Sequence, residues 1–234
     1  MCIRDSYARI EHLPNGRYAI RRSATMEKDQ TYALYNLTQE QLARTLMPVG
    51  EYSKDRIREM ADEIGLLVAH KPDSQDICFV PDGDYASFIE NTTDQVLPTG
   101  NFVTPEGKVL GKHKGIIHYT VGQRKGLGLA LGYPAFVLEI RPETNEVVIG
   151  TYEESLTYTV RANELNFMSV EQITEPVRIF AKIRYNHKGA WCTVERTGED
   201  EIVCTFDEPI RAATPGQAVV LYDGEYVLGG GTIL

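Results

Sequence analysis

A single thiol, Cys78, stands in a stretch of the sequence that reads KPDSQDICFVPDGDY. Buried structural cysteines usually occupy apolar periodic segments, whereas this one follows four polar residues and precedes a Pro-Asp-Gly turn signal. A thiol in a polar loop is reachable, and its thiolate can act as a nucleophile or carry a sulfur atom. Because Asp73 and Asp76 would disfavour the thiolate if they faced the sulfur, we expect both carboxylates to point elsewhere. On the residues alone, a structural role for Cys78 is the alternative.

The other cysteines and the histidines form neither a metal-binding motif nor a disulfide pattern. Cys192 and Cys204 lie in the strand-like segments AWCTV and IVCTF, where we interpret both as core residues. Four scattered cysteines exclude a disulfide scaffold and favour a reducing, cytoplasmic location. His113 and His118 have no Cys, Asp or Glu at ligand spacing beside them, so no bound metal is predicted.

The charge distribution is acidic overall with two basic segments. The formal net charge of -9 argues at first against a nucleic-acid partner. Residues 107–126 and 178–191, however, carry several lysines and arginines and no acid. Each segment is either a solvated surface or a phosphate-binding stripe. No apolar run approaches the roughly 20 residues that cross a bilayer, so no membrane segment is predicted.

The first third of the sequence reads as α/β. Residues 7–11 and 17–22 flank Pro-Asn-Gly and predict a hairpin, and Thr38 with Gln41 predicts a capped helix. A second helix is expected from Ser53 to Gly65. Its apolar positions, which should line one buried face, are Ile57, Met60, Ala61 and Ile64. Residues 65–70 (GLLVAH) look like a short strand that leads into the Cys78 segment.

The remainder is strand-rich. A short helix (DYASFIE) is followed by two expected hairpins, VTPEGKVLG and one that turns at residues 143–145. Five strands after residue 176 then predict a small closed barrel: VRIFAKIRY, AWCTVER, EIVCTFDE, QAVVLYDG and YVLGGGTI. In the first of these strands, alternation sends Ile179, Ala181 and Ile183 to one face and the basic residues to the other.

Six segments, in order along nearly the whole chain, resemble the tRNA-specific 2-thiouridylases. They are KDQTYAL, DSQDICFV, GKHKGIIHYTVGQRKGLGLALGYPAFVLEI, AKIRYNH, TPGQAVVLYDG and LGGGTI. The resemblance implies an enzyme that activates the wobble uridine of certain tRNAs with ATP and magnesium, then replaces its 2-oxygen by sulfur from a cysteine persulfide. It also implies a sulfur-donor partner, a cysteine desulfurase or a relay protein.

The resemblance assigns roles residue by residue. Cys78 matches the persulfide-carrying cysteine of the family. The positions that match its tRNA contacts are Lys28, Asp29, Gln30, Arg184, Tyr185 and Gln217. A guanidinium can grip a phosphate and a phenol can stack on a base or donate a hydrogen bond, as Arg184 and Tyr185 would do. Without the resemblance, Lys28–Gln30 could equally be a helix N-terminus, and Gln217 a polar residue that starts a strand.

The resemblance implies an α/β remnant of a nucleotide-binding (ATP-pyrophosphatase-like) domain, a small central domain and a C-terminal antiparallel β-barrel. We expect these at residues 1–83, 84–158 and 159–234. The family's phosphate-binding loop and its first catalytic cysteine have no counterpart here. The family reads Gly-His-Tyr-Ala-Arg where this chain reads Asp5-Ser6-Tyr7-Ala8-Arg9.

We therefore expect residues 1–6 to be foreign, Cys2 and Ser6 to have no family role, and the chain alone to be an inactive, incomplete form. The alternative from another class is a non-catalytic RNA-binding module in which Cys78 is inert.

Overall fold

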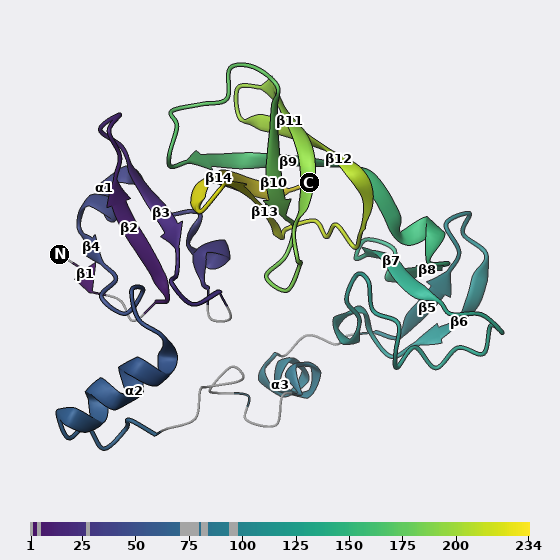
Figure 1. Ribbon diagram of the computed structural model, residues 1–234. Helices are drawn as coiled ribbons and strands as arrows, with labels where there is room; N and C mark the ends of the chain where they lie inside the picture. The colour runs from purple at the N-terminus through teal and green to yellow at the C-terminus, as the bar shows by residue number, and fades with distance from the viewer. Residues whose placement is uncertain (1, 4–5, 27–28, 71–79, 81–83, 94–97) are drawn as a thin grey trace. The chain divides into compact units, whose positions relative to one another are not determined.

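The computed structural model describes residues 2–3, 6–26, 29–70, 80, 84–93 and 98–234, and Figure 1 shows its course. Residues 1–71 and 157–234 form one compact unit, and residues 72–156 form a second. Cys78 and Lys28, two of the residues expected to act, lie outside the described residues.

A six-stranded antiparallel barrel dominates the first unit. Its strands are β9 (Leu156–Phe167), β10 (Val177–Lys182), β11 (Ala190–Gly198), β12 (Glu201–Arg211), β13 (Ala218–Asp223) and β14 (Tyr226–Ile233). They follow the order β13-β10-β11-β12-β9-β14, and β14 pairs with β13 to close the ring. The alternation expected for β10 is confirmed, because Ile179, Ala181 and Ile183 are buried in the barrel core.

The sequence predicted five barrel strands, and β9 is the sixth. Its apolar alternation is short, since only Val160 and Ala162 are fully buried along it. Glu164 then adopts a left-handed backbone conformation with φ of 50°, and the pairing with β14 shifts register between Gly230 and Thr232. A bulge of this kind interrupts the period-two pattern by which a strand is found in a sequence.

The predicted N-terminal hairpin is confirmed and extends the barrel sheet. Strands β2 (Ala8–His12) and β3 (Tyr18–Arg22) pair in antiparallel register, and Arg21 of β3 pairs with Tyr226 of β14. A short parallel pair joins β1 (Cys2–Ile3) to β4 (Thr45–Leu46). Through β3 and β14, the start and the end of the chain share one sheet.

The predicted helix starts are also confirmed. The Thr38 side chain caps α1 (Gln39–Ala43) in a capping box with Gln41, and Ser53 caps α2 (Lys54–Glu63). A 3-10 turn, η2 (Thr31–Leu34), precedes α1.

Two expectations around α2 are wrong. None of its residues is buried, and Ile64 is 72% exposed, so the described residues do not cover the expected apolar face. Residues 65–70 form a turn instead of a strand. Gly65 has φ of +72° and the Leu66 amide donates to the Ala61 carbonyl at 2.9 Å, which is how a helix C-terminus is closed. A mostly apolar segment such as GLLVAH forms a strand only where a neighbouring strand pairs with its backbone N–H and C=O groups.

In its described residues, the second unit contains one α-helix and a four-stranded sheet. Helix α3 (Tyr85–Thr92) is capped by Asp84. The strands are β5 (Gly100–Val103), β6 (Val109–His113), β7 (Phe136–Arg141) and β8 (Glu146–Gly150), in the order β6-β5-β8-β7. Both hairpins match the sequence expectation, and 3-10 turns η3 (Ile116–His118) and η4 (Glu153–Ser155) follow β6 and β8. A core around Phe102, Tyr119 and Val147 holds this unit together.

Candidate nucleic-acid interface

Two expected binding segments from opposite ends of the chain meet in the first unit. The Tyr185 hydroxyl donates to the backbone carbonyl of Asp29 at 3.4 Å, across 156 residues of sequence. Tyr185 lies in the turn after β10, and Asp29 lies just before η2. We call the residues around this contact the junction cluster: Arg22, Asp29, Tyr32, Lys182, Arg184, Tyr185 and Tyr222.

The side chains of Asp29 and Gln30 are already used to hold the loop before η2. One Asp29 carboxylate oxygen accepts from the Ser23 amide at 3.1 Å, and the other accepts from the Thr31 hydroxyl at 2.6 Å. The Gln30 side-chain carbonyl accepts from the Tyr7 amide at 2.9 Å. These bonds fix the backbone against which Tyr185 packs, and within the described residues the Gln30 amide NH2 donates no hydrogen bond.

Lys182 lies between two aromatic rings. Its ammonium nitrogen is 5.7 Å from the centroid of Tyr32 and 5.8 Å from that of Tyr185. Burial lowers the pKa of Lys182, and the Asp29 carboxylate nearby partly opposes this effect. The Lys182 ammonium is thus stabilised by the faces of the two tyrosine rings and by electrostatic attraction to the Asp29 carboxylate, in a partly dehydrated position.

Arg184 anchors the turn that carries Tyr185. Its Nη1 donates to the carbonyl of Arg211 at 2.7 Å and to that of Ala212 at 3.4 Å. Burial lowers the pKa of Arg184, and the positive charge of Arg211 adds to the effect. The Nη1 of Arg184 therefore stabilises the end of β12, and the other guanidinium nitrogens can donate to a ligand.

His187 and Gly189 shape the same turn. The His187 Nδ1 accepts from the Ile183 amide at 3.4 Å, and burial lowers the pKa of this imidazole to about 4, with Arg184 and Lys182 adding to the shift. Gly189 has φ of +88°, and a Cβ there would lie 2.1 Å from the Phe180 ring, so only glycine fits.

Two tyrosines form the buried wall of the junction cluster. The Tyr32 hydroxyl donates to the carbonyl of Ala218 at 2.8 Å, and the Tyr222 hydroxyl lies 3.3 Å from that of Thr31. Burial raises the pKa of both phenols to about 12. The bond to Ala218 brings Tyr32 next to exposed Gln217, the remaining expected contact, although Gln217 itself makes no side-chain bond in the described structure.

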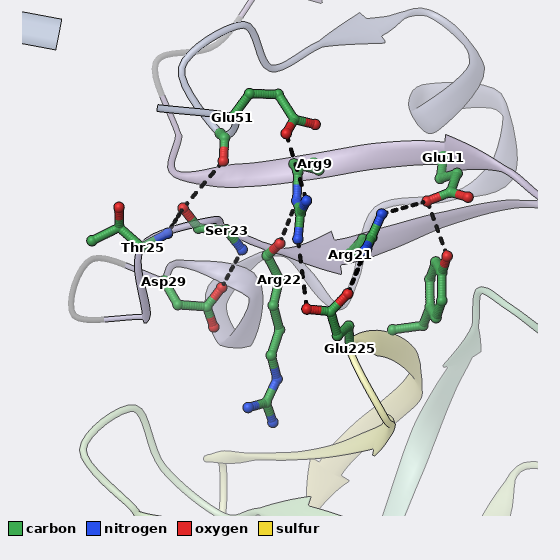
Figure 2. A network of polar contacts seen from close by, with 11 residues as sticks. Arg9, Glu11, Arg21, Arg22, Ser23, Thr25, Asp29, Glu51 and Glu225 are labelled. Atoms are coloured by element: carbon green, nitrogen blue, oxygen red, sulfur yellow. Dashed lines mark hydrogen bonds and ion pairs between the residues drawn. The ribbon is translucent and has the colours of Figure 1, made fainter. Parts of the chain in front are cut away.

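Arg22 is a residue that the sequence reasoning missed. Figure 2 shows its neighbours Arg9 and Arg21 in a polar network, while the Arg22 guanidinium extends away from it. Arg9 and Arg21 both pair with Glu225, at 3.9 and 2.5 Å. The Arg22 guanidinium instead lies over the ring of Tyr222, 4.5 Å from its centroid. Consecutive arginines with different partners leave no signal in the sequence, so the position of Arg22 could come only from the structure.

The basic side of β10 is not uniformly positive. Arg178 pairs with Asp207 at 2.6 Å and lies over the ring of Trp191, 4.7 Å from its centroid. Lys182 faces the same side four residues later and has no ion pair in the described residues. The net positive charge is thus concentrated at the Lys182 end of the strand.

The cysteines and histidines of the described residues serve packing and local bonds. Cys192 and Cys204 are both fully buried in the barrel core, and the hydrogen bond with Cys192, followed by burial, raises the pKa of the Cys204 thiol. In the second unit, the Nδ1 of His113 accepts from the Gly115 amide and His118 pairs with Glu90 at 3.2 Å. Within the described ranges, no three His, Cys, Asp or Glu side chains gather as a metal site.

Comparison with known proteins assigns a family profile to each part of the chain. Residues 4–82 match a tRNA methyl transferase HUP domain, residues 86–151 a tRNA methyl transferase PRC-barrel domain, and residues 157–233 an aminomethyltransferase β-barrel domain. The fold is therefore a partial HUP domain, a PRC-barrel middle domain and a six-stranded antiparallel barrel, which defines a class of tRNA-modifying enzymes.

Two curated relatives are named for one such modification. The chain is 63% identical to the tRNA-specific 2-thiouridylase MnmA of Lachnoclostridium phytofermentans over 97% of its own length and 64% of the relative's. It is 52% identical to the protein of the same name from Clostridioides difficile, over 97% of its length and 63% of that relative's. The chain belongs to the tRNA-specific 2-thiouridylase family. It spans less than two thirds of the length of these relatives. No helix in the described part of the chain is both long and apolar enough to cross a membrane.

Proposed function

We propose that this chain is the tRNA-binding and sulfur-carrying part of a tRNA-uridine 2-sulfurtransferase. The observation that carries the proposal is the contact between Tyr185 and Asp29, because it joins two segments that match the family's tRNA contacts into one surface. Around it, the described members of the junction cluster include three cations, Arg22, Lys182 and Arg184, and one carboxylate, Asp29. A positive, aromatic surface of this kind suits RNA, whose phosphates attract cations and whose unpaired bases stack on phenol rings.

In the reaction proposed for the complete enzyme, the terminal sulfur of a Cys78 persulfide would bond to C2 of the wobble uridine, and the 2-oxygen would leave with the group that activates it. A second thiol would then break the S–S bond by forming a disulfide with Cys78. The sulfur would arrive from a cysteine desulfurase or a relay protein. Support for the role of Cys78 comes from its polar sequence setting and the DSQ-x-IC match. The rival proposal keeps the RNA-binding surface and makes Cys78 inert.

ATP, with magnesium, is the activating cofactor that the family resemblance implies. In the first turns of α1 and α2, the Gln41 amide donates to the Thr38 hydroxyl and the Arg56 amide donates to the Ser53 hydroxyl, so these two donors are already used. No step proposed for this chain passes through ATP, and we propose that the 234-residue polypeptide alone does not form 2-thiouridine.

A binding experiment with one exposed tyrosine tests the surface. The affinity of an unmodified tRNA transcript with a wobble uridine is measured for the parent chain and for Tyr185→Ala, Tyr185→Phe and Tyr158→Ala. Stacking of a base on an aromatic side chain contributes about 1–3 kcal/mol, so Tyr185→Ala should weaken binding at least fivefold. Tyr185→Phe should keep most of the affinity, and Tyr158→Ala, which removes an exposed tyrosine outside the cluster, should keep all of it. Equal affinity in all four proteins would reject the proposed surface.

A further inference from the structure

Arg22 and Lys182 are two cations of the junction cluster without a carboxylate partner. In the described part of the chain neither forms an ion pair, whereas Arg9, Arg21 and Arg178 each do. The Nε of Arg22 is buried and has no hydrogen-bond acceptor among the residues that the structure describes. A buried donor without an acceptor is costly, and it is uncommon in folded proteins unless a ligand or water completes it.

Aromatic rings replace only part of the water that these cations lose. Lys182 lies over Tyr32 and Tyr185, and Arg22 lies over Tyr222. A ring face attracts a cation but accepts no strong hydrogen bond in the plane of a guanidinium. Among the described residues, the Asp29 carboxylate forms no ion pair with either cation; its two oxygens accept from the Ser23 amide and the Thr31 hydroxyl.

The two cations lie close enough to share one ligand. Arg22 also lies over Phe180, 6.0 Å from the ring centroid, and Phe180 and Lys182 are neighbours on the same face of β10. Residues two apart on a strand are separated by about 7 Å. The positive charge of Arg22 also contributes to the lowered pKa of Lys182, which agrees with this proximity.

We propose, on the basis of the RNA-binding role above, that Arg22 and Lys182 together bind one phosphate group of an RNA backbone. The planar guanidinium donates through Nε and the ammonium donates from the other side. Tyr185, half-exposed beside Lys182, then contacts the adjoining nucleotide. Arg184 is not included in this phosphate site, because its Nη1 already donates to the carbonyls of Arg211 and Ala212.

The salt dependence of tRNA binding tests this inference. The variants are Arg22→Gln, Lys182→Gln and the double variant, with Arg178→Gln as the matched control on the same face of β10. Each single substitution should weaken binding about five- to tenfold. The double variant should lower the slope of log affinity against log salt by about 0.7 to 0.9, the value for one phosphate. Arg178→Gln should leave the slope unchanged, because Asp207 already neutralises this arginine.

A slope loss near twice that value in the double variant would mean two separate phosphates and would overturn the shared site. An unchanged affinity and slope in the double variant would overturn it as well. Thermal melts establish that each variant is folded. Lys182→Met, which keeps an apolar stem over the same rings, replaces Lys182→Gln if that variant is not folded, and Arg22→Met replaces Arg22→Gln in the same way.

A second measurement separates this inference from the proposed function. Inorganic phosphate, compared with chloride at equal ionic strength, should raise the melting temperature of the parent chain and not that of the double variant. If phosphate stabilises the parent but tRNA does not bind, the phosphate site stands and the proposed function fails. If tRNA binds the parent and the double variant equally, and phosphate has no effect, the proposed function stands and the phosphate site is wrong.

Discussion

Replacing Arg184 by alanine should have two separable effects, one on stability and one on tRNA binding. The structural part comes from the bond between its Nη1 and the Arg211 carbonyl at 2.7 Å. Hydrogen bonds from charged groups contribute about 1.5–3 kcal/mol, and water replaces part of this at a partly exposed guanidinium. We therefore expect Arg184→Ala to lower the free energy of unfolding by about 1 kcal/mol, or the melting temperature by about 2–4 °C.

The binding part comes from the Nε and Nη2 atoms of Arg184, which form no hydrogen bond within the described residues. If they neutralise one tRNA phosphate, the slope of log affinity against log salt becomes shallower by about 0.7 to 0.9 in Arg184→Ala. Between 50 and 200 mM salt, this slope difference changes the ratio of the two affinities by about threefold. The deficit of the variant should thus be largest in low salt and shrink as salt is added.

Filter binding across that salt range and thermal melts of the same preparations measure the two effects. Arg184→Lys serves as the control, because it keeps the charge but not the planar reach to the carbonyl of Arg211. It should recover the salt slope without recovering stability. Unchanged affinity and slope in Arg184→Ala would refute the RNA contact, and unchanged stability would refute the anchoring bond.

Three further predictions concern other residues. Burial depresses the pKa of His187 in the folded state from 6.5 to about 4. As the pH falls, the unfolded chain therefore binds a proton before the folded chain does. The contribution of His187 to the stability of the barrel is complete above pH 6.5 and is lost as the pH falls towards 4. His187→Gln should flatten this part of the stability curve in denaturant titrations at pH 7.5 and 4.5, and an identical pH dependence in both proteins would contradict the assignment. Incubation with a persulfide donor should add sulfur to Cys78, which peptide mass spectrometry detects. The added sulfur should be absent from Cys78→Ser, and equal modification of both proteins would show that Cys78 is not the sulfur carrier. The 234-residue polypeptide should form no 2-thiouridine with ATP, magnesium and a sulfur donor, and nucleoside analysis that detects this product would show that the chain is sufficient.

Local structure followed from the sequence where short-range rules decide it. The caps at Thr38 and Ser53, the hairpin of β2 and β3 and the alternation of β10 depend on neighbouring residues, and each was predicted. Residues 65–70 were predicted wrongly because hydrophobic composition does not say whether a neighbouring strand is present. The bulge at Glu164 hid β9 for a related reason, since it breaks the pattern used to find strands.

The candidate site could be predicted only in part. The sequence pointed to Asp29, Arg184 and Tyr185, but it could not show that Asp29 lies beside Tyr185, because that contact depends on how β3 joins β14. It also grouped Arg178 with Lys182 in one basic strip. Pairing with Asp207 removes the effective charge of Arg178, and a partner from another strand has no signature near position 178.

Site-specific crosslinking gives the most direct test of the junction cluster as the tRNA-binding surface. A photoreactive phenylalanine analogue is placed at Tyr185 or at Glu199, an exposed residue in the turn at the far end of β11, roughly 25 Å along the strand. Irradiation with labelled tRNA should give a crosslink from position 185 that unlabelled tRNA suppresses, and little or none from position 199. A crosslink from position 199 without one from position 185 would contradict the account.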